Sequence, residues 1–138
     1  LLKIDITKNM LFDPKKAISF EGDTGPYLLY SYARASSILR KAGLPELSIP
    51  TALENPETKL IKKLYSFPMA VRYADERLSP SVIANYAFDL SQIFNEFYHS
   101  CQVIGSEKEA FRLNLVNAFR TVLGRCLWLL GIETIEEM

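Results

Sequence analysis

Histidine and cysteine are scarce in this 138-residue sequence, which has one histidine, His99, and two cysteines, Cys101 and Cys126. A single histidine excludes a histidine-rich metal site, and two cysteines this far apart do not have the paired spacing of a zinc ribbon. The sequence therefore predicts no metal site and two thiols that stay reduced.

Long apolar runs and an excess of charge of one sign are also missing. No stretch approaches the roughly 18 consecutive apolar residues that could span a bilayer, so we expect no membrane segment and a cytoplasmic location. Sixteen basic residues balance sixteen acidic ones. No overall positive field would therefore drive strong nonspecific binding to nucleic acid, and we expect no DNA partner. Any contact with nucleic acid must come from a local arrangement of side chains.

Motifs of catalysis are absent as well. The sequence contains no Gly-x-Ser-x-Gly elbow, no P-loop and no paired cysteine clusters, which are the local patterns that common nucleophilic, phosphate-binding and metal chemistries require. The single histidine has no evident partner. We therefore expect no catalytic residue and no bound cofactor in this chain.

Helical spacing of apolar residues is what the sequence has instead. Its 138 residues, 49% of them hydrophobic, are enough for one domain with its own core, so residues 1–138 are treated as one domain. No convincing alternating strand is present, which predicts an all-α helical bundle of about five helices. Residues 1–23 are expected to be an irregular lead-in with a single helical turn from Asp13 and Pro14 through Ile18.

Proline and glycine mark the ends of the predicted helices. Five helices are expected to begin near Pro26, near Pro56, at Ser66 or Phe67, at Pro80 and after Ser106. Ser106 and Glu109 have the spacing of a capping box. Gly43 and Gly131 suit the left-handed residue beyond a helix end, so the first and last long helices should stop there.

The last long helix carries the widest apolar surface. Its expected inner stripe is Phe111, Leu115, Ala118, Val122, Cys126 and Leu129. Leu123, Leu127, Trp128 and Leu130 widen that surface near the carboxyl end. We therefore expect neighbouring helices to cover this end, Trp128 included.

One aromatic residue of the first long helix faces away from its apolar stripe. At roughly 100° per residue, Tyr30 points about 200° away from Leu28, with Arg34 on the same far side. An exposed ring flanked by basic side chains is a platform for an unpaired base of an RNA loop. A tyrosine packed under a neighbouring helix would have the same spacing, so the position alone leaves both interpretations open.

Tyr98 and Asn95 lie at the edge of the helix predicted from Pro80 to about Cys101. Measured around the axis from Leu90, Tyr98 lies about 80° away and Asn95 about 140° away. The ring of Tyr98 can therefore lean on the core while its hydroxyl and one face reach solvent. An ordinary tyrosine at the edge of the core would satisfy the same geometry.

The stretch FEGDTGPYLLYSYARASSILRKAG, from residue 20 onward, resembles the segment that opens the C-terminal helical domain of class I arginyl-tRNA synthetases. A block of the form F-E-G-D-T-G-P-Y-x-x-Y-x-x-A-R recurs in that family. A second similarity joins FNEFYH at residues 94–99 to the last long helix, to Gly131-Ile132-Glu133 and to a terminal Met138. The two similarities occur in the same order and cover essentially the whole chain, which we therefore expect to be the C-terminal fragment of a larger synthetase.

The resemblance implies that this domain recognises the anticodon of the tRNA for arginine. The attached catalytic domain of the same chain would join arginine to that tRNA with ATP and magnesium. By motif, Tyr30, Tyr98 and Met138 would surround the anticodon bases, including the middle cytosine. Arg34, Asn95 and Arg120 are candidates for contacts with the RNA backbone, or are only surface residues.

The end of the chain departs from the family pattern. The family commonly ends in Arg-Met, whereas here Glu137 precedes Met138. A negative charge at that position would repel phosphate, so the implied contact of Met138 is less secure than those of the two tyrosines.

Two other functions remain open at this stage. A helical protein-interaction module could dock a partner helix on the exposed face that carries Tyr30. The related helical domain of cysteinyl-tRNA synthetases is the second alternative, although it lacks the F-E-G-D-T-G-P-Y block.

Overall fold

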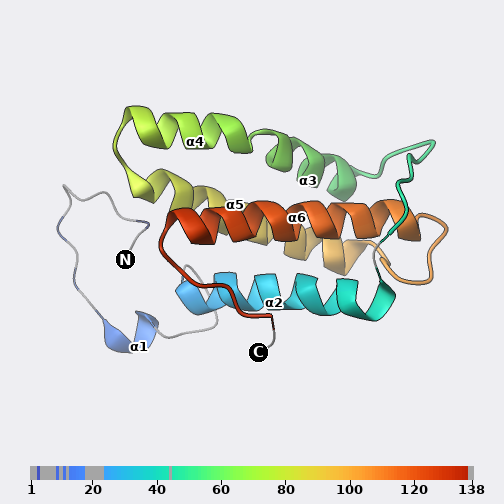
Figure 1. Cartoon of the computed structure of the whole chain (residues 1–138), viewed down its shortest axis with the longest axis horizontal. Helices are drawn as coiled ribbons and strands as arrows, with labels where there is room; N and C mark the ends of the chain where they lie inside the picture. Colours follow the sequence, from blue (N-terminus) through green and yellow to red (C-terminus); the bar gives the residue numbers. More distant parts are fainter. Residues whose placement is uncertain are drawn as a thin grey trace.

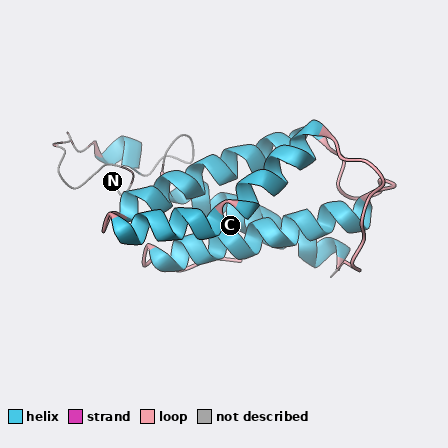
Figure 2. Ribbon diagram, turned by 90° about the horizontal axis from the view of Figure 1, so that it is seen from above, coloured by secondary structure: helices cyan, strands magenta, loops and turns pink. Residues whose placement is uncertain are grey.

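The computed structural model describes Lys3, Asn9, Leu11 and residues 13–17, 24–43 and 45–136. These residues form helices and no strand, so the predicted all-α architecture is confirmed (Figure 1, Figure 2). The helices are α1 (Pro14–Ala17), α2 (Gly25–Ala42), α3 (Asn55–Tyr65), α4 (Phe67–Glu76), α5 (Pro80–Ser100) and α6 (Glu109–Leu129). The helix α1 is the single turn expected after Asp13, while most of the predicted lead-in over residues 1–23 lies outside the described residues.

The bundle is built around two central helices, α5 and α6. Figure 1 shows α2 along one side of this pair and α3 with α4 along the other. The segment after α6 turns back and runs beside α2, where the Tyr32 hydroxyl donates a hydrogen bond to Glu136 Oε1 at 3.3 Å. None of the described helices combines the length and apolar character that a bilayer crossing requires.

Capping residues and prolines place most helix ends as expected. The Thr24 hydroxyl accepts a hydrogen bond from the Tyr27 backbone N–H at 3.3 Å, so α2 begins one residue before the predicted Pro26. Pro68 separates α3 from α4, because proline has no N–H to donate to the preceding turn,. Gly43 and Gly131 end α2 and α6 with positive φ values of 81° and 70°,.

The capping box predicted at Ser106 is wrong. The Ser106 hydroxyl donates to the Val103 carbonyl oxygen at 3.2 Å, and the Glu109 carboxylate accepts a hydrogen bond from the Gly105 backbone N–H. Both side chains therefore stabilise the turn between α5 and α6. The helix α6 consequently begins at Glu109, with no side-chain cap at its first turn.

The predicted inner stripe of α5 forms the centre of the core. All seven of its members are buried: Ile83, Tyr86, Ala87, Leu90, Phe94, Phe97 and Cys101. Phe94 stacks on Phe119 of α6, with ring centroids 3.7 Å apart and planes within 3° of parallel. Cys101 and Cys126 are both buried and unpaired, as expected for reduced thiols.

The inner stripe predicted for α6 is displaced around the helix. The buried residues of α6 are Arg112, Leu113, Leu115, Val116, Phe119, Leu123, Cys126 and Leu127. Arg112 lies near the middle of this face, and an apolar pattern cannot anticipate a charged residue there. Trp128 lies about 160° around the helix from Arg112 and is 73% exposed. The expectation that other helices cover Trp128 is therefore wrong.

Arg112 can be buried because two glutamate carboxylates neutralise its charge. Its Nε donates to Glu57 Oε1 at 2.8 Å, and its Nη2 donates to Glu54 Oε1. Lys108 Nζ contacts the same two carboxylates at 3.0 and 3.3 Å. Glu57 is fully buried and Arg112 is 6% exposed. These four residues, called the Glu57–Arg112 cluster below, connect the start of α3 to the start of α6.

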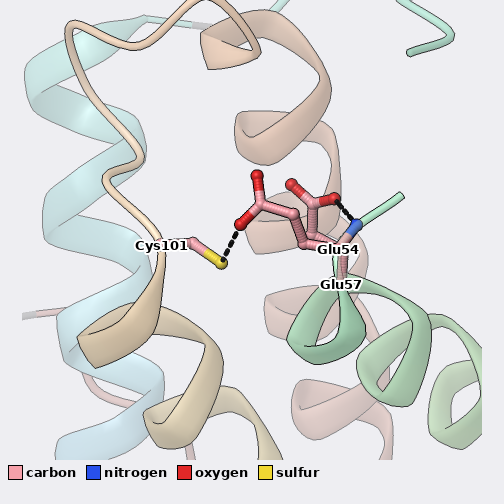
Figure 3. Close-up of side chains that lie close together, drawn as sticks. All are labelled: Glu54, Glu57 and Cys101. Carbon is pink, nitrogen blue, oxygen red and sulfur yellow. Dashed lines mark hydrogen bonds between the residues drawn. The ribbon is translucent and has the colours of Figure 1, made fainter. Parts of the chain in front are cut away.

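Cys101 completes a group of acidic and thiol side chains whose ligand atoms all lie within 4.8 Å of one another (Figure 3). Burial raises the pKa of the Cys101 thiol, which stays protonated and donates to Glu54 Oε2. The remaining oxygen, Glu57 Oε2, accepts from the Glu54 backbone N–H at 2.7 Å. Every carboxylate oxygen thus already has a donor from the protein. The donor set fits an ion-pair cluster rather than a metal site.

The cluster makes stability sensitive to acid. Burial raises the pKa of Glu57, but hydrogen bonds from Glu54 N–H, Arg112 and Lys108 outweigh burial and hold this pKa below its ordinary value of 4.5. A lowered carboxyl pKa stabilises the fold above the unfolded pKa, and this contribution is lost as pH falls through the folded pKa. We expect Glu57→Gln to melt below the unchanged chain at pH 7. This gap in melting temperature should narrow below pH 4.5 in circular-dichroism melts. A difference in melting temperature that stays constant down to pH 3 would contradict this role of the Glu57 charge in stability.

Candidate nucleic-acid interface

Tyr30 lies on the outer side of α2, as the helical projection predicts. Its side chain is 40% exposed. Arg34, one turn further along the helix, donates from Nη2 to the Tyr30 hydroxyl at 2.6 Å, and its guanidinium carbon lies 4.6 Å from the centre of the Tyr30 ring. The interpretation of Tyr30 as a residue packed under a neighbouring helix is therefore wrong.

Tyr98 lies across from Tyr30, on α5. Its side chain is 37% exposed, and its ring leans on Phe94 of the core with centroids 6.3 Å apart. The guanidinium carbon of Arg34 lies 5.6 Å from the Tyr98 ring centre. Arg34 thus contacts both tyrosine rings and brings together the two aromatic residues that the sequence singled out.

Asn95 holds Arg34 in this position. Its Oδ1 accepts from Arg34 Nη1 at 3.0 Å, and its Nδ2 donates to the Tyr27 hydroxyl at 2.7 Å. The hydrogen bonds from Tyr27 through Asn95 and Arg34 to Tyr30 link α2 to α5. Both polar atoms of Asn95 are therefore engaged, which suits a residue that positions Arg34. Tyr27 was missed as a member of this group, although it is the first tyrosine of the G-P-Y-x-x-Y block.

A polar groove of about 540 Å³ opens beside these residues. We call it the tyrosine groove, and its lining is Tyr30, Ala33, Arg34, Ser37, Ile38, Arg40, Lys41, Tyr98, Ile104 and Glu136. Three basic side chains face one acidic side chain there. Ring faces, hydroxyl groups and positive charge together suit an unpaired base with its phosphate. Its described lining includes no histidine and no cysteine.

Of the remaining predicted residues, Arg120 does not join the tyrosine groove. Arg120 lies over the Tyr32 ring, 5.9 Å from its centre, and lines a separate groove on α6. Met138 and Glu137 lie outside the described residues. Glu136, the last described residue, lines the tyrosine groove. The RNA contacts of Tyr30, Tyr98, Met138, Arg34, Asn95 and Arg120 all stay predictions.

Known sequences match this chain over nearly its whole length. The family model of the DALR anticodon binding domain matches residues 28–138. The arginine–tRNA ligase of Phocaeicola vulgatus is 43% identical over 148 residues, which cover 100% of this chain and 24% of that protein. The arginine–tRNA ligase of Clostridium acetobutylicum is 42% identical over 142 residues, covering 99% of this chain and 25% of that protein. The chain thus spans about a quarter of the length of these curated relatives.

Solved structures share the arrangement of the helices. The arginyl-tRNA synthetase of Thermus thermophilus matches 92% of this chain with 23% of its own, at a TM-score of 0.84 and 38% sequence identity. The arginyl-tRNA synthetase of Plasmodium falciparum matches 99% of this chain with 25% of its own, at a TM-score of 0.87 and 28% identity. In both cases the similarity is to one part of a longer protein.

Proposed function

The chain belongs to the DALR anticodon binding domain family, and from that premise we propose that it recognises the anticodon loop of the tRNA for arginine within a larger arginine–tRNA ligase. The catalytic domain of the same protein would join arginine to this tRNA with ATP and magnesium, in the cytoplasm. The names of the relatives and the share of their length that the chain covers support this division of labour.

The observation that carries the proposal is the contact of Arg34 with both exposed tyrosine rings. Both rings are partly exposed, and stacking of an unpaired base on an aromatic ring contributes about 1–3 kcal/mol per base. The guanidinium places a positive charge between the rings, next to the groove that Lys41 also lines. A chain with no net charge thereby acquires a local field that attracts a phosphate backbone.

Arg34 also retains hydrogen-bonding capacity. A guanidinium carries five N–H donors, and the hydrogen bonds to Asn95 and Tyr30 use one N–H on each of its two terminal nitrogens. The N–H groups not used in these bonds can donate to base or phosphate oxygens. Because Asn95 fixes the plane of the guanidinium, little ordering of Arg34 is needed when RNA binds.

The two alternatives are not favoured. A protein-interaction module would need an apolar face on α2 for a partner helix, whereas the lining of the groove beside Tyr30 includes two arginines, a lysine and a serine. The relatives named above are arginine–tRNA ligases rather than cysteinyl-tRNA synthetases.

Anticodon stem-loops of RNA test the proposal directly. We expect the chain to bind a labelled stem-loop with an arginine anticodon weakly, in a manner that higher salt opposes. Replacing the middle cytosine of the anticodon should weaken binding at least about fivefold, since one base-specific contact is worth about 1 kcal/mol or more. Fluorescence anisotropy measures both affinities, with circular dichroism to show that the protein is folded. Equal affinity for the two stem-loops would contradict anticodon recognition.

A further inference from the structure

A second groove lies on the outer side of α6. It has a volume of about 730 Å³ and is bounded by α6 and by the segment that follows it, including Gly131 and Thr134. Trp128 lines this groove and is 73% exposed, although it is one of the largest apolar side chains in the sequence. The described part of the chain therefore leaves most of the Trp128 surface uncovered beside this groove.

Two arginines accompany Trp128. Arg120 and Arg125 both line the groove, and neither forms an ion pair with any residue in the described part of the chain. Glu133 is the acidic residue of the lining. Thr121, Arg125 and Trp128 follow one another at steps of four and three, so they form one row along α6. The groove thus has an excess of positive charge beside an exposed indole ring.

The floor of the groove is aromatic. Gly124 lies in its lining, and a Cβ atom at Gly124 would come within 3.2 Å of the Tyr32 ring. The missing side chain lets this ring approach α6 closely, and Arg120 lies over it with its guanidinium carbon 5.9 Å from the ring centre. Tyr32 also donates to Glu136, which lines the tyrosine groove. The segment after α6 therefore separates two neighbouring grooves.

We propose that this second groove, here called the tryptophan groove, binds a further unpaired segment of the same RNA. A base stacks on Trp128, and Arg120 and Arg125 receive its phosphates. This inference rests on the proposed function, because it requires the RNA that occupies the tyrosine groove. Stacking on an indole and ion pairing with phosphate are tolerant of base identity. The tryptophan groove therefore adds affinity, while discrimination between anticodons remains with the tyrosine groove.

The charge of the tryptophan groove favours RNA over a partner protein as its ligand. Two arginines without carboxylate partners in the described residues match a phosphate backbone, and the apolar surface beside them is a single indole rather than a continuous stripe,. Trp128 also points away from the core face of α6. Core packing therefore does not account for it.

The fluorescence of Trp128 reports on this groove alone, because the sequence contains one tryptophan. We expect the arginine anticodon stem-loop to quench this fluorescence, with the same midpoint as the anisotropy titration. The stem-loop with the altered middle base should quench it only at correspondingly higher concentration. Anticodon-dependent anisotropy without any change in tryptophan emission would overturn the proposal that RNA binds in the tryptophan groove. It would leave the proposed function intact.

A matched pair of charge variants gives the second readout. We expect Arg125→Gln to weaken binding of both stem-loops to the same extent, about threefold to tenfold, and to lower the slope of log affinity against log salt by about 1. Arg72→Gln is the control, because it removes the same charge from an exposed position on α4. Equal affinities for the two variants would overturn the role of Arg125. Quenching by both stem-loops at one midpoint would support RNA binding in the groove and contradict the proposed function.

Discussion

Replacing Arg112 by alanine is expected to lower the free energy of unfolding by about 3–5 kcal/mol, the usual cost of leaving one member of a buried ion pair without its partner. Glu57 is fully buried. Its Oε1 would lose the Arg112 Nε donor at 2.8 Å, and the Gln102 carbonyl would lose the Nη1 donor, also at 2.8 Å. Urea unfolding followed by circular dichroism at pH 7 measures this change.

An exposed ion pair of the same fold is the control. Lys59 Nζ lies 2.9 Å from Glu96 Oε1, with both side chains about half exposed at 47% and 51%. Removing such a pair costs about 0–1 kcal/mol, so Lys59→Ala should change stability little. A double variant, Arg112→Met with Glu57→Leu, should recover part of the loss because no isolated charge stays buried. An Arg112→Ala variant as stable as Lys59→Ala would contradict the role assigned to the cluster.

Tyr98→Ala is expected to weaken binding of the arginine stem-loop by about 1–3 kcal/mol, or about 5-fold to 150-fold, because it removes one stacking surface of the tyrosine groove. Tyr98→Phe keeps the ring and should keep most of the affinity. The melting temperature should fall only slightly in both variants, since 37% of the side chain is exposed. Anisotropy and circular-dichroism melts measure the two effects separately.

Tyr65 provides the matched control for a lost ring. It is 87% exposed at the end of α3 and does not line the tyrosine groove. Tyr65→Ala should therefore leave RNA binding unchanged. If Tyr98→Ala instead lowers the melting temperature strongly and leaves affinity unchanged, Tyr98 is a core residue. If Tyr98→Phe binds the stem-loop as weakly as Tyr98→Ala, the contribution of Tyr98 to binding comes from its hydroxyl group rather than from its ring.

Local signals in the sequence predicted the helices well where a helix buries one apolar stripe. The prolines at Pro68 and Pro80 and the glycines at Gly43 and Gly131 lie at helix ends because they act through their own backbone conformation,. The stripe of α5 was correct for the same local reason. The stripe of α6 was displaced because Arg112, a charged residue, lies on the buried face and is neutralised by residues far away in the sequence.

The features of the candidate site also fall into those that local sequence predicted and those that depend on contacts between helices. Helical projection turned Tyr30 away from the apolar stripe of α2 and put Tyr98 at the edge of the core, but it left open whether a neighbouring helix covers Tyr30. The structure shows both residues partly exposed. It did not predict that Arg34 contacts both rings, that Asn95 and Tyr27 hold Arg34, or that Arg120 lines a different groove. These contacts depend on the approach of α2 to α5 and to α6.

The amino-acid sequence by itself determined the helical class, most helix ends and the direction of Tyr30 away from the apolar stripe of α2, because each depends on residues within a few positions of one another. Only the tertiary structure decided which side chains meet in the two grooves and which charges are buried. Arg34 and Asn95 are 61 positions apart, and Glu57 and Arg112 are 55 apart. Such pairs form only when the packing of whole helices brings them together, and the packing angle between helices is not encoded in the spacing along either one.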